Sequence, residues 1–195
     1  MNAGEFDKRI TVLKHTRDAD GNYSLVPAYK RWAKTEETAE NCVYSNYAFG
    51  VKALKLDTRL LDLPCGTFLS YPPDTYLVTA CITDRMYSHI TAAGVRVSQC
   101  TASRYTTEKD GLNRQRSELR RLFSFPAVIG EKYVRPIEYI THGEVERGVV
   151  LTTHKDIELL EGDIVKTGDD TYIIRACHTQ DPDKNDYEAE RKRDV

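Results

Sequence analysis

Two segments of the chain repeat nearly the same sequence 96 residues apart. The first, at residues 66–83, reads GTFLSYPPDTYLVTACIT, and the second, at residues 162–179, reads GDIVKTGDDTYIIRACHT. Glycine, Thr-Tyr and Ala-Cys recur at the same places in both segments without a gap. An internal repeat of this length predicts that one folding unit occurs twice in the chain.

Each repeated segment has the pattern of short strands separated by turns. Turn-forming residues gather at Pro64 to Gly66 and Pro72 to Asp74 in the first copy, and at Glu161 to Gly162 and Gly168 to Asp170 in the second. The residues between them are mostly β-branched or aromatic, which favours strands. We therefore expect a β-meander over residues 53–83 and a superimposable one over residues 149–179.

The same spacing extends backward from the quoted segments. It places Leu61 on Ile157 and Leu63 on Leu159, and it further aligns Leu54 with Val150 and Leu56 with Thr152. Within the segments it places Tyr76 on Tyr172, immediately before the most apolar strand of each copy. Because the shared spacing fixes the strand register, we expect these two tyrosines to be packed in equivalent settings.

The parts upstream of the repeat match less well. The alternating segment RITVL around Ile10 aligns with PAVIG around Val128, an offset of 118 residues, so the first copy would carry 22 residues that the second lacks. We assign the excess to a long polar loop at about residues 34–50. Its composition favours contact with a partner, and the candidate contact residues are Tyr44, Asn46, Tyr47 and Phe49.

Residues 104–121 lie between the two copies and are expected to form a linker. Gly111 interrupts this stretch, and Leu112, Leu119 and Leu122 could share one side of a short helix. The predicted domains are thus residues 1–103 and 122–195. The predicted fold is all-β, with two tandem small antiparallel β-barrel or meander domains joined by a short basic linker that can be helical.

Composition excludes several functional classes. The formal net charge is −2, with 28 basic and 30 acidic residues, which argues against a whole-chain polyanion binder. No apolar run is long enough for a membrane span, and the N-terminal residues lack the apolar core of a signal peptide, so a cytoplasmic protein is expected. The five cysteines lack a CxxC pair and the five histidines lack metal-site spacing, so we expect no disulfide framework, metal or cofactor.

Catalytic motifs are also missing from the sequence. There is no GxSxG, GxGxxG or P-loop pattern. Cys177 and His178 are adjacent, but neighbouring residues of a strand point to opposite faces, which disfavours a catalytic pair. The sequence therefore predicts a protein that is not an enzyme.

The N-terminal half resembles the phage head-tail joining, or head-closure, family. The resemblance rests on Arg9-Ile10, on the D-x-x-G turn from Asp18 to Gly21, and on Trp32-Ala33. It continues at Tyr76-Leu77-Val78 and at Val95-Arg96-Val97, and it covers roughly residues 5–98. The second half departs from the family pattern, because it repeats the meander but lacks a Trp-Ala pair and a recognisable D-x-x-G turn.

The resemblance implies a structural virion protein of the phage neck rather than an enzyme. It implies a small β-barrel that assembles with itself into a ring of roughly six or twelve copies around the DNA channel. The implied partners are a portal or adaptor protein, a tail protein and, transiently, the packaged DNA, with no membrane. The protein would occupy the virion neck after assembly and the host cytoplasm before it.

Several basic residues are candidates to face such a DNA channel. They are Lys52, Lys55, Arg59, Arg114, Arg116, Arg120 and Arg121. Two other functional classes stay open: a ring adaptor of a tail or of a secretion-like machine, and a two-domain ligand-binding module or enzyme that uses the cleft between the repeats.

Overall fold

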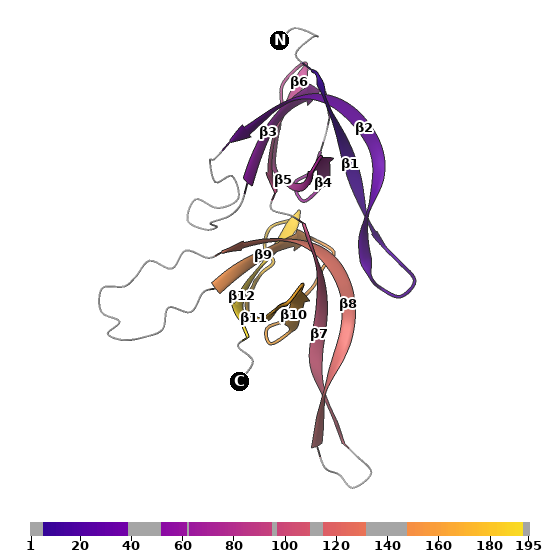
Figure 1. The fold of residues 1–195 in the computed structure, drawn as a ribbon, viewed down its shortest axis with the longest axis vertical. Coiled ribbons are helices and arrows are strands. Elements are labelled where there is room, and N and C mark those ends of the chain that lie inside the picture. Colours follow the sequence, from indigo (N-terminus) through magenta and orange to yellow (C-terminus); the bar gives the residue numbers. More distant parts are fainter. Residues whose placement is uncertain are drawn as a thin grey trace, which may run out of the picture.

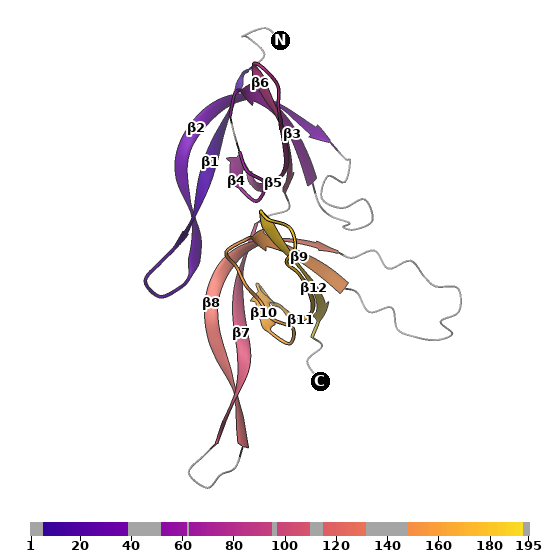
Figure 2. The same cartoon turned by 180° about the vertical axis from the view of Figure 1, so that it is seen from behind.

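The computed structural model describes residues 6–38, 52–61, 63–94, 97–109, 115–131 and 148–192. Within these ranges there are twelve strands and no helix, and the strands form two closed antiparallel six-stranded barrels. The predicted all-β fold with two tandem β-domains is confirmed. Figure 1 shows the barrels one above the other along the long axis of the molecule, and Figure 2 shows the same arrangement from behind.

Barrel 1 is formed by the first six strands, in the order β1-β2-β3-β6-β5-β4, and it closes through pairing of β1 with β4. The strands are β1 (Lys8–Arg17), β2 (Tyr23–Thr38), β3 (Lys52–Arg59), β4 (Phe68–Tyr71), β5 (Asp74–Thr83) and β6 (Tyr87–Gly94).

Barrel 2 has the same order, β7-β8-β9-β12-β11-β10, and closes through β7 and β10. The strands are β7 (Ser98–Lys109), β8 (Gln115–Glu131), β9 (Gly148–His154), β10 (Ile164–Thr167), β11 (Asp170–His178) and β12 (Lys184–Arg191).

The predicted repeat of the meander is confirmed at residue level. Leu69 pairs with Tyr76 in barrel 1, and Val165 pairs with Tyr172 in barrel 2, with 96 residues between equivalent positions. Gly66 and Gly162 both have positive φ, 83° and 87°, at equivalent turns. The peptide N–H of each glycine donates to β5 or β11, so the turn chemistry read from the sequence sets the strand register in both copies.

The backward extension of the 96-residue spacing is wrong by one residue in β3 and β9. Leu54 and Leu56 belong to the core of barrel 1, and their counterparts in the core of barrel 2 are Val149 and Leu151 rather than Val150 and Thr152. Thr58 and Thr153, each of which donates to the carbonyl of the next residue, confirm an offset of 95. The second copy therefore has one additional residue before Ile157.

The upstream alignment is also wrong. The pairing register shifts opposite a bulge between Val12 and Leu13 of β1 and between Ala102 and Ser103 of β7, so the N-terminal strand corresponds to β7, at an offset of 90 residues. The segment around Val128 belongs to β8, the counterpart of β2. The first copy thus has no 22-residue excess, because each copy has a segment between its second and third strands, 13 residues at 39–51 and 16 at 132–147.

The expected linker over residues 104–121 is not a linker, and no described residue in it is helical. Residues 104–109 end β7 and residues 115–121 begin β8, so the second barrel starts at Ser98 instead of residue 122. The two strands pair along this stretch, with Tyr105 opposite Leu119 and Glu108 opposite Arg116, although Arg104 faces Arg120. The pairing of the two strands outweighs the weak helical pattern. Similarly, Lys34 to Thr38, expected in the long loop, extend β2.

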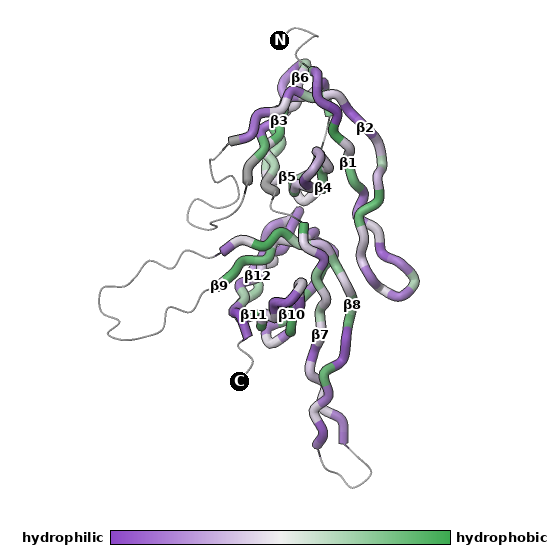
Figure 3. Tube along the Cα trace, viewed as in Figure 1, coloured by the Kyte–Doolittle hydropathy of each residue, from purple (hydrophilic) through white to green (hydrophobic). Residues whose placement is uncertain are grey.

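Each barrel encloses its own apolar core. Apolar residues alternate along the strands, and Figure 3 shows them as green segments of the tube within the purple ones. Tyr76 and Tyr172 are 2% and 7% exposed, as expected from the repeat. In barrel 2 the hydroxyl of the buried Tyr187 accepts from the Leu159 N–H and donates to the Ile157 carbonyl, which fixes the segment that crosses the barrel end.

No helix of the described chain is long and apolar enough to cross a membrane.

Candidate functional site: the barrel interface and the free barrel ends

The β1–β2 hairpin extends beyond barrel 1 and lies on β8 of barrel 2 (Figure 1). Its tip is the D-x-x-G turn predicted from the sequence: Gly21 has a φ of 82°, and the Asn22 N–H donates to the Asp18 carboxylate at 2.8 Å. The Asn22 side-chain oxygen then accepts from the Ser124 N–H at 3.0 Å and from Arg121 at 3.4 Å. The turn therefore presents an amide side chain to the second barrel.

Tyr23 connects the hairpin to the core of barrel 2. Its side chain packs with the buried residues of that barrel, with its ring edge-on to Phe123 at 5.4 Å. Its hydroxyl donates to the Asp156 carbonyl at 3.1 Å, and its own carbonyl accepts from Gln99 at 3.4 Å. A residue of the first repeat thus completes the core of the second, which makes the contact between the barrels an integral part of the fold.

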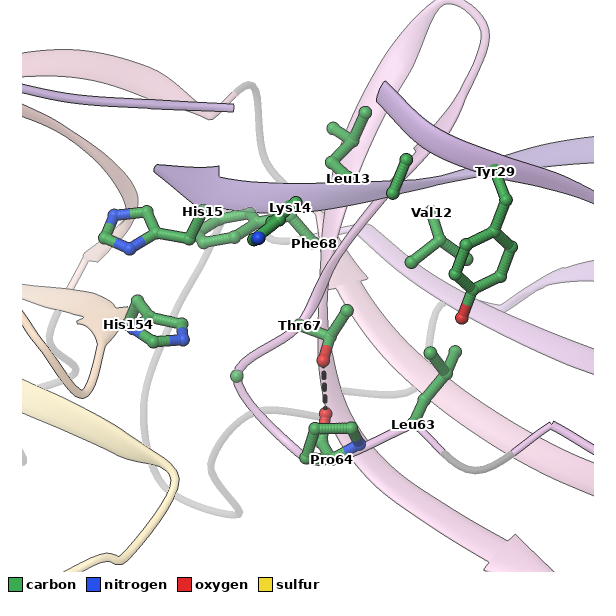
Figure 4. Close-up of a pocket in the computed structure, with 12 residues that line it drawn as sticks. Val12, Leu13, Lys14, His15, Tyr29, Leu63, Pro64, Thr67, Phe68 and His154 are labelled. Carbon is green, nitrogen blue, oxygen red and sulfur yellow. Dashed lines mark hydrogen bonds between the residues drawn. The ribbon is translucent and has the colours of Figure 1, made fainter. Parts of the chain in front are cut away.

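His15 lies at the centre of this joint (Figure 4). Its side chain is 5% exposed and its ring stacks on Tyr23 at 4.9 Å and on His154 at 4.5 Å. Burial, together with the nearby His154, lowers the pKa of His15 to about 4, although the Asp156 carboxylate at 3.8 Å acts in the opposite direction. His15 is therefore neutral at pH 7, and its buried Nε2 has no hydrogen-bond partner.

His15, His154 and Asp156 are close enough together to be considered as metal ligands. The two imidazole planes are inclined by only 23°, so their lone pairs run side by side instead of converging on one ion. His154 Nδ1 also already accepts from the Asp156 N–H at 3.2 Å. This geometry fits a packed joint between two barrels better than a metal centre.

Apolar packing extends the joint toward β4 and β5. Phe68 and Leu77 of barrel 1 form a small buried cluster with Val128 of barrel 2, and Leu13, Leu25 and Val97 pack against it. Gly66 approaches the loop before β12 so closely that a Cβ there would lie 2.3 Å from the Asp183 carbonyl oxygen. A cavity of about 400 Å³ opens beside the joint and is lined by His15, Thr67 and His154, among others (Figure 4).

The opposite end of barrel 1 is free and apolar. Trp32 is 58% exposed and Leu60 is 57% exposed. With Phe6, Arg31 and Arg59 they line a pocket of about 560 Å³, and the guanidinium of Arg9 lies over the Trp32 ring. A bulky aromatic surrounded by cations at an exposed barrel end is typical of a surface that another macromolecule covers.

The free end of barrel 2 also carries exposed apolar side chains. Tyr105 and Leu119, paired across the β7–β8 hairpin, are 52% and 46% exposed, and Leu160 is 55% exposed. The hairpin extends away from both barrels in Figures 1 and 2. Among the described residues there is thus one covered barrel–barrel contact, and two barrel ends that none of them covers.

The structure does not bring the predicted basic residues together as one set. Lys55 and Arg59 lie exposed on β3 of barrel 1, where the backbone of Lys52 also lies, and Arg116 and Arg120 lie exposed on β8 of barrel 2. Arg121 takes part in the contact between the barrels through Asn22 and Ser124. The predicted partner-contact residues Tyr44, Asn46, Tyr47 and Phe49, and the basic residue Arg114, lie outside the described residues.

Cys177 and His178 do not form a catalytic pair. The Cys177 thiol donates to the Leu159 carbonyl at 3.4 Å, and burial raises its pKa, which disfavours the reactive thiolate. His178 is exposed beside Glu188, at 3.4 Å. The expected orientation on opposite faces of the strand accounts for the separation.

Sequence reasoning missed the residues of the joint. His15, Tyr23 and His154 are far apart in the chain, and only the stacking of one barrel on the other brings them into contact. The only available signal was the polar D-x-x-G turn, which indicated a turn but not its partner. No family model, curated protein or solved structure matches the chain.

Proposed function

We propose that the protein is a structural subunit of a phage neck, a head-tail connector that forms a ring around the DNA channel. In this role it lies between the portal or adaptor and the tail. The observation that carries the proposal is the tandem pair of small closed barrels whose outer ends both expose apolar side chains. Such a subunit is suited to contacts with neighbouring subunits at both ends, as a ring requires.

The sequence motifs supply the phage assignment. The short strand at Arg9-Ile10, the turn ending at Gly21 and the Trp32-Ala33 pair occur at β1, the hairpin tip and β2, in the order typical of head-tail joining proteins. In the proposal, basic residues on β3 and on the β7–β8 hairpin, such as Lys55 and Arg116, face DNA that passes through the ring.

Particles of the virus that encodes the chain provide the direct test. Removal of the protein should give filled heads that are not joined to otherwise complete tails, and labelled protein should appear at the neck by electron microscopy. Label only within isolated tails, with heads and tails still joined when the protein is absent, would instead favour a tail adaptor and contradict the proposal.

The segment between β2 and β3 allows a sharper version of this test. Because β2 ends at Thr38 and β3 starts at Lys52, residues 39–50 can be shortened to a flexible linker without cutting a strand. We expect a folded protein with unchanged thermal stability that no longer joins heads to tails. Infectious particles at the normal yield would remove this segment from the mechanism.

A further inference from the structure

The contact between the two barrels defines where a like barrel can bind. It joins the end of barrel 1 that carries His15, Leu25 and Gly66 to the end of barrel 2 that carries His154 and Asp183. Because the barrels are repeats of one unit, each barrel has one end of each of these two kinds. Within the chain, barrel 1 uses the first kind of end and barrel 2 uses the second. The first kind of end on barrel 2 and the second kind on barrel 1 therefore remain.

The unused counterpart on barrel 2 can be located from the strand pairing. His15 pairs with Leu25 in the first hairpin, and Tyr105 pairs with Leu119 in the second, each pair following the shared bulge by the same number of residues. His15 and Leu25 are covered by the other barrel, whereas Tyr105 and Leu119 are 52% and 46% exposed. The second hairpin therefore exposes an apolar pair at the position equivalent to the one through which the first hairpin contacts barrel 2.

The turn glycines support the same correspondence. A Cβ at Gly66 would collide with Asp183 of barrel 2, whereas a Cβ at Gly162 would have no neighbour within 4 Å. Leu160, two residues before Gly162, is 55% exposed. This end of barrel 2 has the turn geometry of a docking end, but no residue in the described part of the chain is docked on it.

The unused counterpart on barrel 1 is equally apolar. Asp183, which lies against Gly66, corresponds to Met86, because Asp183 precedes β12 as Met86 precedes β6. Met86 is 64% exposed, and Leu60, whose N–H donates to the Met86 carbonyl, is 57% exposed.

The charges around Leu160 of barrel 2 and Leu60 of barrel 1 are complementary, although Arg120 adjoins Leu119 at the same end of barrel 2. Glu158 and Glu161 are exposed around Leu160 on barrel 2. Exposed cations predominate around Leu60 and Met86 on barrel 1, where Arg31, Arg59 and Arg85 outnumber the exposed carboxylate of Asp84. Opposite charges around apolar centres favour the association of these two ends and disfavour the association of two identical ends.

We propose that copies of this chain bind one another end to end, with the Tyr105–Leu119 end of barrel 2 seated on the Leu60–Met86 end of barrel 1 of the next copy. The contact repeats the one that joins the two barrels within the chain. It is heterologous, so successive copies form a ring when the rotation per step closes and an open array when it does not. This contact rests on the proposed function in one respect only: it is the contact that joins the subunits of the proposed ring.

Two complementary variants test this arrangement. Tyr105→Asp/Leu119→Asp removes the barrel 2 end and keeps the barrel 1 end, and Leu60→Asp/Met86→Asp does the reverse. All four side chains are exposed, so both variants should fold, which their circular dichroism and melting temperature verify. Val26→Asp is the matched control, because its side chain is 46% exposed on the β1–β2 hairpin, beside the joint and away from both free ends.

Sedimentation of the purified chain from about 1 µM to about 1 mM gives the readout. The wild type and Val26→Asp should be small at the lowest concentration and grow in mass as concentration rises, since a single contact is weak. Each double variant alone should stay monomeric. An equimolar mixture of the two should form a one-to-one dimer and nothing larger, because only one productive pair of ends remains.

Three outcomes would overturn the proposal: a wild type that stays monomeric throughout, double variants that associate like the wild type, or a double variant that dimerises with itself. The test is separate from that of the neck assignment. Association through these ends by a protein absent from the neck would refute only the assignment, and neck incorporation of both double variants at wild-type level would refute only the contact.

Discussion

The imidazole rings of His15 and His154 stack across the joint between the two barrels, with centroids 4.5 Å apart. Because His15 is buried, its folded-state pKa is about 4, below its ordinary value of 6.5. Between these values the unfolded chain binds more protons than the folded one, so stability falls as pH falls from 6.5 toward 4. His15 should account for up to about 3 kcal/mol of this loss.

His15→Phe keeps a stacking ring but removes the titration. In denaturant unfolding between pH 7 and pH 4, the free energy of unfolding of the wild type should therefore fall more steeply with decreasing pH than that of the variant. His89 is the control, because Asp57 at 2.6 Å raises its pKa and makes its contribution largest at low pH. His89→Gln should shift the pH dependence in the opposite direction. If the free energies of unfolding of the wild type and His15→Phe changed equally with pH, the assignment of this pH dependence to His15 would be contradicted.

Gly66 and Gly162 form a matched pair for measuring the joint. Alanine at either position must adopt a positive φ, which costs about 1 kcal/mol in both barrels. Only at Gly66 does the new Cβ also meet a backbone oxygen, that of Asp183. We expect Gly66→Ala to lower the free energy of unfolding by about 2 kcal/mol more than Gly162→Ala. Equal losses of unfolding free energy in the two variants would mean that the backbone at Asp183 moves away from the new Cβ without a measurable loss of stability.

The meander was predictable from the sequence because its determinants are local. Glycines at Gly66 and Gly162, followed by an alternating strand, specify turn and register within about 20 residues of sequence. The joint was not predictable, because His15 and His154 meet only through the relative placement of two complete barrels. The linker was misplaced for a different reason: Leu112, Leu119 and Leu122 have a weak helical spacing, whereas the pairing of Tyr105 with Leu119 places the described part of this stretch in two strands.

The Arg104–Asp163 pair is specific to barrel 2. The Asp163 carboxylate is 1% exposed, and the Arg104 guanidinium binds both of its oxygens, at 2.6 and 2.8 Å. Arg104→Leu should lower the free energy of unfolding by about 2 to 3 kcal/mol, because it leaves a buried carboxylate without its cation. Lys14 occupies the corresponding place on β1, where Thr67 stands in the position of Asp163, so Lys14→Leu should be nearly neutral. Similar losses in both variants would assign the effect to side-chain packing.

Tyr76 and Tyr172 test whether the two repeats are stabilised in the same way. Each precedes the bulge of its strand, pairs with an apolar residue of the preceding strand, and is at least nine-tenths buried. Truncation to alanine removes a whole ring from a closed barrel, so each variant should lose about 2 to 4 kcal/mol of unfolding free energy in chemical denaturation. Phenylalanine at either position keeps the ring, and it should cost less than 1.5 kcal/mol because the Tyr172 hydroxyl has only a long contact, 3.4 Å, with Asp170. Unchanged stability in either alanine variant would contradict a stabilising role for its buried ring, and a loss confined to one barrel would show that the two equivalent positions contribute differently to stability although their backbones are alike.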